Sequence, residues 1–229
     1  MNGYGVYMRK RLVLFFILFS VVSIGHCLAI TTQEVVRRVQ ERYEKIWSLT
    51  AHFVQESTNK MLNQTRITEG KVYFEKSGLM RWEYTTPPKN KWVSDGKTLW
   101  FYEPEENQVV VERVDLEKGR LFLAFLVGEG DLERDFTVHR LDQEVEENKR
   151  GYQIELTPRQ PHAIMDRLIL TVDRKKGYVR QADVYDAYGN LTRTLFSRIR
   201  VNRKLAPDLF TFVIPPGTEV IENPGLSSQ

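Results

Sequence analysis

The sequence predicts an α+β fold that is mainly β, with one N-terminal helix followed by an antiparallel sheet. Two observations carry this prediction. Apolar residues recur at three- and four-residue steps soon after residue 30, and beyond residue 48 nearly every apolar run alternates with polar residues. The alternating runs are joined by short turns, which favours an antiparallel sheet over parallel strands connected by helices.

The first 29 residues are predicted to be a cleaved secretory signal peptide. A basic n-region at 9–11 precedes an apolar run at 12–24. That run is shorter than the ~20 residues that a membrane-spanning helix needs. Ala29 fits a cleavage site, so we expect cleavage after it and export to the periplasm through the Sec pathway. Met8 is an alternative start, because residues 1–7 add nothing that a signal requires.

Cys27 offers an alternative to this cleavage, a lipobox whose cysteine is lipidated. His26 stands before it where a lipobox needs Gly, Ala or Ser, which favours cleavage after Ala29. Cleavage removes the chain's single cysteine, so the mature protein has neither disulfides nor thiol chemistry. It also removes three basic and no acidic residues from a chain with 33 basic and 30 acidic ones. The mature chain is therefore neutral, and no general attraction to nucleic acid or to an anionic membrane follows.

Residues 31–47 predict one amphipathic helix. Thr31 to Glu34 has the form of a capping box, in which a threonine hydroxyl accepts from a first-turn N–H and Glu34 reaches back. Apolar residues then form a broad stripe: Val35, Val36, Val39, Tyr43, Ile46 and Trp47. The charged residues on the other side of this helix are predicted to be solvated.

The segment 79–104, LMRWEYTTPPKNKWVSDGKTLWFYEP, is the most informative part of the chain. Bulky and polar residues alternate on both sides of Asp95-Gly96, a dipeptide that takes the φ > 0 turn of a tight hairpin. Three of the four tryptophans lie here: Trp82, Trp92 and Trp100. Aromatic residues packed so densely on short strands predict a large apolar sheet face, which protein, membrane or ligand must cover.

Further strands are predicted at 109–111, 136–139, 152–156, 168–172, 178–185 and 191–201. No linker interrupts them, so residues 30–222 are predicted to form a single domain, followed by a flexible tail at 223–229. The exception is 115–132, where an apolar run between glycines favours a buried strand and a short helix equally.

Three blocks of the sequence resemble a known family. RWEY-x-x-P followed by VSDGKTLWFYEP is similar to the central hairpin of the periplasmic outer-membrane lipoprotein carrier proteins, the LolA family. LTAHFVQ at 49–55 resembles the family's L-x-A-x-F-x-Q, and FTFVIPPG at 210–217 looks like its C-terminal F-x-F-x-P-P-x-G. The resemblance spans roughly Thr32 to Ile221.

This resemblance implies a fold and a function. The fold would be a half-open, strongly curved antiparallel β-barrel covered by a lid of short α-helices. The function would be to shield the acyl chains of lipoproteins in a hydrophobic cavity. Cargo would come from an ATP-driven inner-membrane transporter of the LolCDE type and leave to an outer-membrane acceptor of the LolB type, where one exists. We expect a monomer without a cofactor.

The acyl-chain cavity is predicted to be lined from both layers. The sheet side would contribute Val72, Phe74, Met80, Trp82, Trp92 and Trp100, and the lid side Val39, Phe122 and Phe125. Apolar contacts without direction suit a carrier that must release its guest, because each buried methylene already contributes ~0.8 kcal/mol. The alternative for each of these residues is an ordinary core position.

Some members of the resembled family latch the lid with an arginine in the turn between the first two sheet strands. Counting back from Trp82, that position is Lys76 here, followed by Ser77-Gly78. Lysine lacks the planar fork of donors that arginine provides. We therefore expect either weaker latching by Lys76 or latching by another residue, Arg81.

An enzyme is one rival function. After the signal only His52, His139 and His162 remain as histidines, and no H-E-x-x-H, G-x-S-x-G or phosphate-binding glycine loop is present. No set of metal ligands emerges either. Paired carboxylates such as Glu105-Glu106 are neighbours in turns, not a constrained acid–base couple. The sequence thus predicts a protein that is not an enzyme.

A second rival keeps the fold and changes the cargo. A periplasmic glycolipid or phospholipid carrier, or a stress regulator that senses lipoproteins, would bury acyl chains in the same way. Nothing in the residues separates a lipoprotein cargo from another acylated lipid, so that distinction depends on the resemblance alone.

Overall fold

The computed structural model describes residues 30–114, 130–140, 151–162 and 165–223. The predicted signal peptide and the tail beyond 223 lie outside the described residues. So do Phe122 and Phe125, the two lid residues expected from the segment 115–132.

Helix α1, Thr32–Glu44, confirms the predicted amphipathic helix. The hydroxyl of Thr31 caps it by accepting from the backbone N–H of Glu34 at 3.2 Å. Glu34 does not reach back to complete the box, because its carboxylate binds Arg37 and Arg38 instead. Those two guanidiniums, by hydrogen bonding, lower the pKa of Glu34. The helix ends three residues earlier than predicted, at Glu44.

Within the described residues, twelve strands form one sheet in the order β12-β6-β5-β4-β3-β2-β1-β11-β10-β9-β8-β7. Their bounds are β1 Ser48–Asn59, β2 Gln64–Glu75, β3 Leu79–Tyr84, β4 Lys91–Asp95, β5 Thr98–Glu103, β6 Gln108–Arg113, β7 Phe136–Arg140, β8 Tyr152–Pro158, β9 Arg167–Val172, β10 Val179–Tyr185, β11 Leu191–Val201 and β12 Glu219–Asn223. Two short helical turns complete the described elements: α3 Leu132–Asp135 and η1 Pro207–Phe210.

The sheet is antiparallel, as predicted, with one exception at its edge. Strand β12 pairs with β6 in parallel, with Val220 opposite Val109. The chain reaches this edge after η1, which contacts β3 and β4. No sequence pattern predicted β12, because its two apolar residues, Val220 and Ile221, are half exposed.

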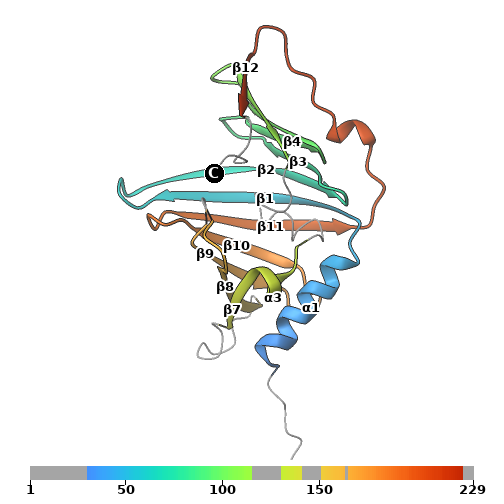
Figure 1. Ribbon diagram of the computed structural model, residues 1–229, viewed down its shortest axis with the longest axis vertical. Helices are drawn as coiled ribbons and strands as arrows, with labels where there is room; N and C mark the ends of the chain where they lie inside the picture. The colour runs from blue at the N-terminus through green and yellow to red at the C-terminus, as the bar shows by residue number, and fades with distance from the viewer. Residues whose placement is uncertain (1–29, 115–129, 141–150, 163–164, 224–229) are drawn as a thin grey trace, which may run out of the picture.

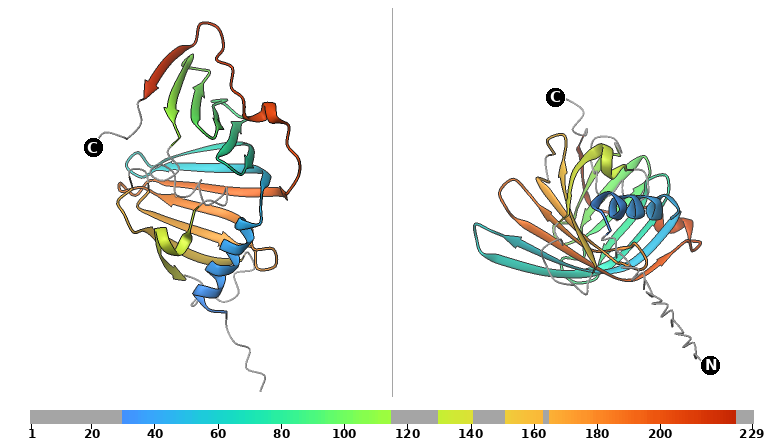
Figure 2. Two further views of the ribbon diagram at one scale, coloured as in Figure 1. Left: turned by 45° about the vertical axis from the view of Figure 1, so that its right-hand side comes forward. Right: turned by 90° about the horizontal axis from the view of Figure 1, so that it is seen from below.

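The sheet curves strongly, and the helices α1 and α3 lie on its concave side (Figures 1 and 2). One apolar cluster joins α1 to the inner residues of the sheet, from Val72 on β2 to Leu156 on β8. Tyr43 ties the helix to β10, because its hydroxyl accepts from the backbone N–H of Val179 at 3.1 Å. Burial raises the pKa of Tyr43, so this phenol stays neutral.

The predicted hairpin turn at Asp95-Gly96 connects β4 and β5. Gly96 has φ +87°, and the Oδ1 atom of Asp95 accepts from the backbone N–H groups of Lys97 and Thr98 at 2.8 and 2.7 Å. This turn fixes the register of the two strands that carry Trp92 and Trp100.

Candidate functional site

The concave face of the sheet is the candidate site, and the strand register identifies its residues. Directly opposed residues of antiparallel neighbours point to the same face. Val72 is opposite Trp82, Trp82 is opposite Trp92, and Trp92 is opposite Phe101. Val72 and Trp82 are buried in the cluster that includes α1, so this row marks the concave face.

Aromatic rings line this face in contact with one another. The ring centroids of Phe53 and Trp82 are 4.7 Å apart, and Phe74 and Phe196 meet the Trp82 indole edge-on at 6.3 and 6.1 Å. Such edge-to-face pairs add ~0.5–1.5 kcal/mol beyond the burial of apolar area. The five-stranded stretch from β11 to β4 therefore presents one continuous aromatic surface to the helices, and Trp92 extends it by stacking on Phe101 at 3.9 Å.

Most of the predicted cavity residues lie together on this surface. Val39, Val72, Phe74, Met80 and Trp82 are all buried in the one cluster, and Trp92 is half-buried against it. The structure brings these six side chains together from α1 and from the three strands β2, β3 and β4. Whether acyl chains contact them remains a prediction.

Trp100 does not lie with them. It is opposite Val93, which alternates with Trp92 along β4, so Trp100 belongs to the convex face. The centroid of its ring is 6.2 Å from that of Phe212. Phe212 belongs to the C-terminal segment, the stretch between β11 and β12, which covers this part of the convex face. The expectation that Trp100 lines the concave face is corrected by the register.

Arg81 also belongs to the convex face, and this rules it out as a latch. Its guanidinium donates to the carbonyl of Leu209 at 3.2 Å and pairs with Glu83, also at 3.2 Å. Burial acts to raise the pKa of Glu83, but Arg81 and Lys91 outweigh it and lower that pKa overall. Arg81 thus holds the C-terminal segment to β3 and does not reach the helices.

Lys76, the other candidate latch, does reach a helix. Its Nζ atom donates to the backbone carbonyl of Glu44 at 2.8 Å, at the C-terminal end of α1. A cation is favourable there, because the last carbonyls of a helix have no partner within it and carry the negative end of its dipole. The side chain of Asn202 makes a second such bond, to the carbonyl of Lys45 at 3.2 Å.

The concave face changes from apolar to polar along β1. Leu49, Ala51 and Phe53 are buried near the helix, whereas Gln55 and Ser57 continue the same alternation toward the hairpin turn. Gln55 accepts from the hydroxyl of Tyr84 at 2.8 Å and donates to Thr194 at 3.1 Å. Burial raises the pKa of Tyr84 to about 12, so it remains a donor at neutral pH.

A groove of about 890 Å³ occupies this polar end of the face. The aromatic residues Tyr84, Trp92 and Phe101 form its inner part, and Asn59, Gln64, Asp186 and Asn190 its outer part. The apolar half is closed by its own packing, so access to it requires the helices to move away from the sheet.

Three residues of this surface were missed by the sequence analysis. Phe101 is opposite Trp92. Phe53 and Tyr84 lie on the neighbouring row of the same concave face, both opposite Gly70. The signal for Phe53 was present, since Leu49, Ala51 and Phe53 alternate within the strand-like motif at 49–55. Phe101 carried no signal, because both it and its neighbour Trp100 are aromatic.

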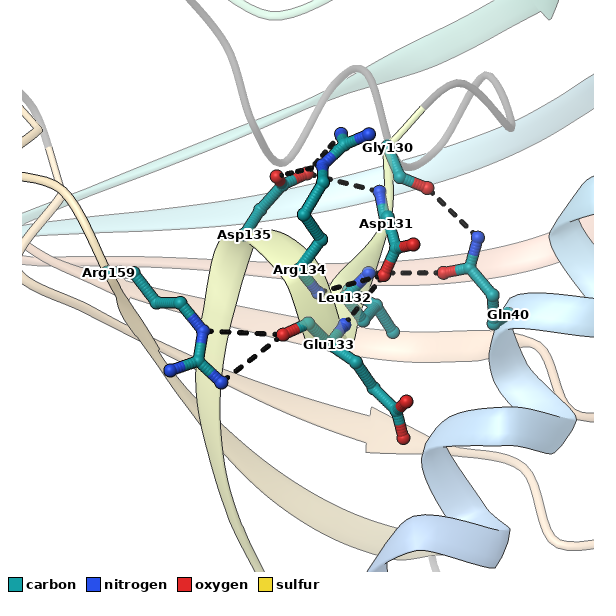
Figure 3. Close-up of polar contacts among 8 residues, drawn as sticks. All are labelled: Gln40, Gly130, Asp131, Leu132, Glu133, Arg134, Asp135 and Arg159. Carbon is teal, nitrogen blue, oxygen red and sulfur yellow. Dashed lines mark hydrogen bonds and ion pairs between the residues drawn. The ribbon is translucent and has the colours of Figure 1, made fainter.

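A polar clamp fixes α3 to α1 (Figure 3). The side-chain amide of Gln40 donates to the carbonyl of Gly130 at 3.0 Å and accepts from the N–H of Leu132 at 3.2 Å. Asp131 caps α3 by accepting from Glu133 and Arg134, at 3.0 and 2.9 Å. Leu132 is buried beneath the clamp.

An ion pair lies within α3 itself, and Arg159 holds this short helix from its other side. Arg134 binds the carboxylate of Asp135 at 2.7 Å, and this bond lowers the pKa of Asp135. Arg159, which follows β8, donates twice to the carbonyl of Glu133 at 3.3 Å. The chain that follows residues 115–129 is thus anchored to both layers of the fold.

Comparison with known proteins decides the family. The family model described as "Outer membrane lipoprotein carrier protein LolA" matches residues 44–213. The chain belongs to the LolA family. An outer-membrane lipoprotein carrier protein of Nitrosospira multiformis is 31% identical over 208 residues, which cover 91% of this chain and 94% of that protein. Its counterpart in Nitrosomonas europaea is 31% identical over 188 residues, covering 82% and 89%.

A solved structure supports the fold of this LolA-family chain. The crystal structure of an uncharacterized conserved protein from Thermus thermophilus matches it with a TM-score of 0.52, over 83% of this chain and 98% of the other. Sequence identity is 14%, so the likeness concerns the fold alone.

In the described parts of this LolA-family chain, no group of three or more His, Cys, Asp or Glu side chains is placed to hold a metal ion. Over the same residues, no helix combines the length and apolar character that crossing a membrane requires.

Proposed function

We propose that this protein carries lipoproteins through the periplasm by shielding their acyl chains between the concave sheet face and the helices. The observation that carries the proposal is the continuous aromatic and aliphatic surface on an open sheet, in a chain of the LolA family. Each acyl methylene removed from water contributes ~0.8 kcal/mol, so several long chains supply ample driving force to separate the two layers.

The contact residues would be Val39, Val72, Phe74, Met80, Trp82 and Trp92, together with Phe53, Tyr84 and Phe101. All nine lie on the concave face of the sheet or on the buried face of α1. These contacts are almost all apolar, and they lack the directional hydrogen bonds that would slow release. The polar groove beside them would accommodate the lipid ester groups and the first residues of the cargo polypeptide.

Membership of the LolA family supports the following partners and location. The donor would be an ATP-driven transporter of the LolCDE type in the inner membrane, and the acceptor, where one exists, a LolB-type protein in the outer membrane. Both exchanges would take place in the periplasm, after removal of the signal peptide. The carrier would act without catalysis, since shielding and release need no bond to be made or broken.

Two tryptophans one strand apart provide the decisive test. Trp92 lies on the concave face and Trp100 on the convex face, and both are half-buried against another aromatic ring. We expect Trp92→Gln to weaken binding of a triacylated lipoprotein roughly tenfold, because it removes an apolar contact worth about 1.5 kcal/mol. Trp100→Gln should leave the affinity within twofold of wild type. Native mass spectrometry of the 1:1 soluble complex measures both.

Unacylated lipoprotein and free phospholipid serve as controls. The proposal requires that the unacylated form does not bind. Binding of phospholipid with no preference for lipoprotein would reassign the function to lipid transport. Equal effects of the two tryptophan substitutions would remove the concave face as the binding surface.

A further inference from the structure

Two hairpin turns at one extremity of the molecule expose large apolar side chains. Met61 and Leu62, between β1 and β2, are 89% and 61% exposed. Tyr188, between β10 and β11, is 83% exposed. Exposed apolar residues scattered singly need no explanation, but three at adjacent turns form a feature of their own.

The two turns are fixed to each other. The backbone N–H of Lys60 donates to the side chain of Asn190 at 2.9 Å. Asp186 closes the second turn by accepting from the N–H groups of Tyr188 and Asn190, each at 2.9 Å. The apolar side chains are therefore presented on a built surface, and not on a frayed loop.

The first hairpin also projects beyond its neighbour in the sheet. Strand β3 pairs with β2 only as far as Gly70, opposite Tyr84, whereas β2 begins at Gln64. Figure 1 shows the joined ends of β1 and β2 at the far left, with the end of the β10 and β11 pair just below. The tip is at the far end of β1 from α1.

The groove opens at this tip. Asn59 and Gln64 flank the first turn, Asp186 and Asn190 belong to the second, and all four line the groove. The same groove ends on the aromatic residues of the concave face. A surface that binds the two turns would therefore lie directly against the mouth of the groove.

The chemistry of the tip suits a lipid bilayer better than a protein. A specific protein interface buries ~800 Å² on each partner, which three side chains on a convex tip cannot supply. A bilayer needs no complementary shape, and its interface favours tyrosine beside apolar and basic side chains. Residues 59–67 contain Lys60 and Arg66 and no acidic residue. The acidic side chain of the second turn, Asp186, accepts hydrogen bonds from Tyr188 and Asn190 within that turn.

We propose that the paired turns are a membrane-contact tip, with Met61, Leu62 and Tyr188 entering the interfacial layer of a phospholipid bilayer. This inference rests on the proposed carrier function and specifies its transfer step. Seated on the bilayer, the tip places the groove mouth against lipid, so acyl chains leave the concave face without crossing water.

Vesicle binding tests the tip. The chain from residue 30 is mixed with vesicles of phosphatidylethanolamine and phosphatidylglycerol, and the bound fraction is measured by flotation. The variant Met61→Ser/Leu62→Ser/Tyr188→Ser should bind at least fivefold more weakly than wild type. The matched control is Val213→Ser/Val220→Ser, which removes exposed apolar residues away from the tip and should bind within twofold of wild type. Equal loss in both variants, or no binding by wild type, would overturn the proposal.

A fluorescent label locates the contact. An environment-sensitive probe on Met61→Cys should shift to shorter wavelength with vesicles and be quenched by brominated lipid. The same probe on Val213→Cys, a position 81% exposed, should do neither. Identical responses at both positions would show adsorption without a defined tip and contradict the proposal.

A separate readout distinguishes this inference from the carrier function. The tip variant should form the soluble complex with triacylated lipoprotein as wild type does, but should deliver it to vesicles at least fivefold more slowly. Failure of wild type to form the soluble complex would overturn the carrier function. The vesicle-binding experiment would then still test the membrane-contact tip independently. Slowed transfer to an acceptor protein, with vesicle binding unchanged, would make the tip a protein-docking site and overturn the membrane proposal.

Discussion

Gly70 determines how closely the aromatic rings approach the sheet. It is opposite Phe53 in the β1–β2 register, and the Phe53 ring lies over its backbone. A Cβ atom added to Gly70 would lie 2.7 Å from that ring and 2.1 Å from the carbonyl oxygen of Glu83. The Phe53 ring can reach Trp82 and Tyr84 because this position carries no side chain.

We therefore expect Gly70→Ala to destabilise the fold by about 1–3 kcal/mol, the usual cost of overpacking, or more because one clash is with backbone. Gly217→Ala is the control. Nothing lies within 4 Å of its added Cβ, so only the positive φ of +81° opposes it, at a cost of about 1 kcal/mol. Urea unfolding followed by tryptophan fluorescence gives both values. A Gly70→Ala variant no less stable than the control would show that the strands shift freely to admit a methyl group.

Trp92 and Trp100 lie on opposite faces of the sheet, and the sequence could not assign either to its face. Alternation indicates a face only where one side of a strand is polar, as on β2. On β4 and β5 both sides are apolar, since Val93 and Trp100 lie under the C-terminal segment. That covering ring, Phe212, is more than a hundred residues away in the chain, so no local pattern could separate the two tryptophans.

At the scale of elements, the clamp between α1 and α3 is a single polar side chain placed between two apolar layers. Gln40 satisfies one carbonyl and one N–H at the start of α3. Removing it would leave the N–H of Leu132 and the carbonyl of Gly130 without these partners in partly buried positions. An unmade bond of this kind costs more than the net value of a made one.

Gln40→Ala should therefore lower the free energy of unfolding by about 1–3 kcal/mol and increase amide exchange at Leu132. Gln33→Ala, on the same helix and outside the clamp, is the matched control and should change stability by less than about 0.5 kcal/mol. Hydrogen exchange read by mass spectrometry resolves the effect by segment. Unchanged exchange around α3 would mean that burial of Leu132 alone holds the element.

Elements with strong local signals were predicted well, and those made by long-range pairing were not. Helix α1 carries its own N-cap, Thr31, and the Asp95-Gly96 hairpin carries its own turn residues. Strand β12 gains its structure only by pairing with β6, and the projection of the β1–β2 hairpin depends on where β3 stops pairing. Such features depend on register between distant segments, which composition and periodicity do not encode.

For the molecule as a whole, two sets of contacts compete for the concave face: packing of α1 and binding of acyl chains. Its aromatic residues are buried against α1 and the other core residues, and acyl chains would have to replace those contacts. Apparent affinity for cargo is then the intrinsic affinity reduced by the fraction of molecules in which the layers are apart. Any bond that holds α1 to the sheet without touching cargo lowers that fraction.

Lys76 makes such a bond. Its substitution should change how firmly α1 is held to the sheet without changing the residues that contact cargo. Its ammonium reaches the Glu44 carbonyl at the exposed end of α1, away from the buried aromatic row. An exposed bond of this kind contributes about 0.5–1 kcal/mol, so Lys76→Ala should raise the apparent affinity for an acylated cargo about two- to fivefold. The bond from Asn202 to Lys45 remains, which keeps the change modest.

Titration with a fluorescent acyl probe measures this change, and Lys71→Ala is the control. Lys71 is exposed on β2 and its alternation with Val72 places it on the convex face, so its removal should leave the affinity unaltered. Lys76→Arg should restore wild-type affinity, because a guanidinium can make the same bond to a helix carbonyl. A weaker affinity in Lys76→Ala would mean that the lysine contacts cargo directly. The balance between closed and open layers would then have to be set by the other contacts of α1. These are the packing of Val35, Val36 and Val39 and the hydrogen bonds that Tyr43 and Asn202 make.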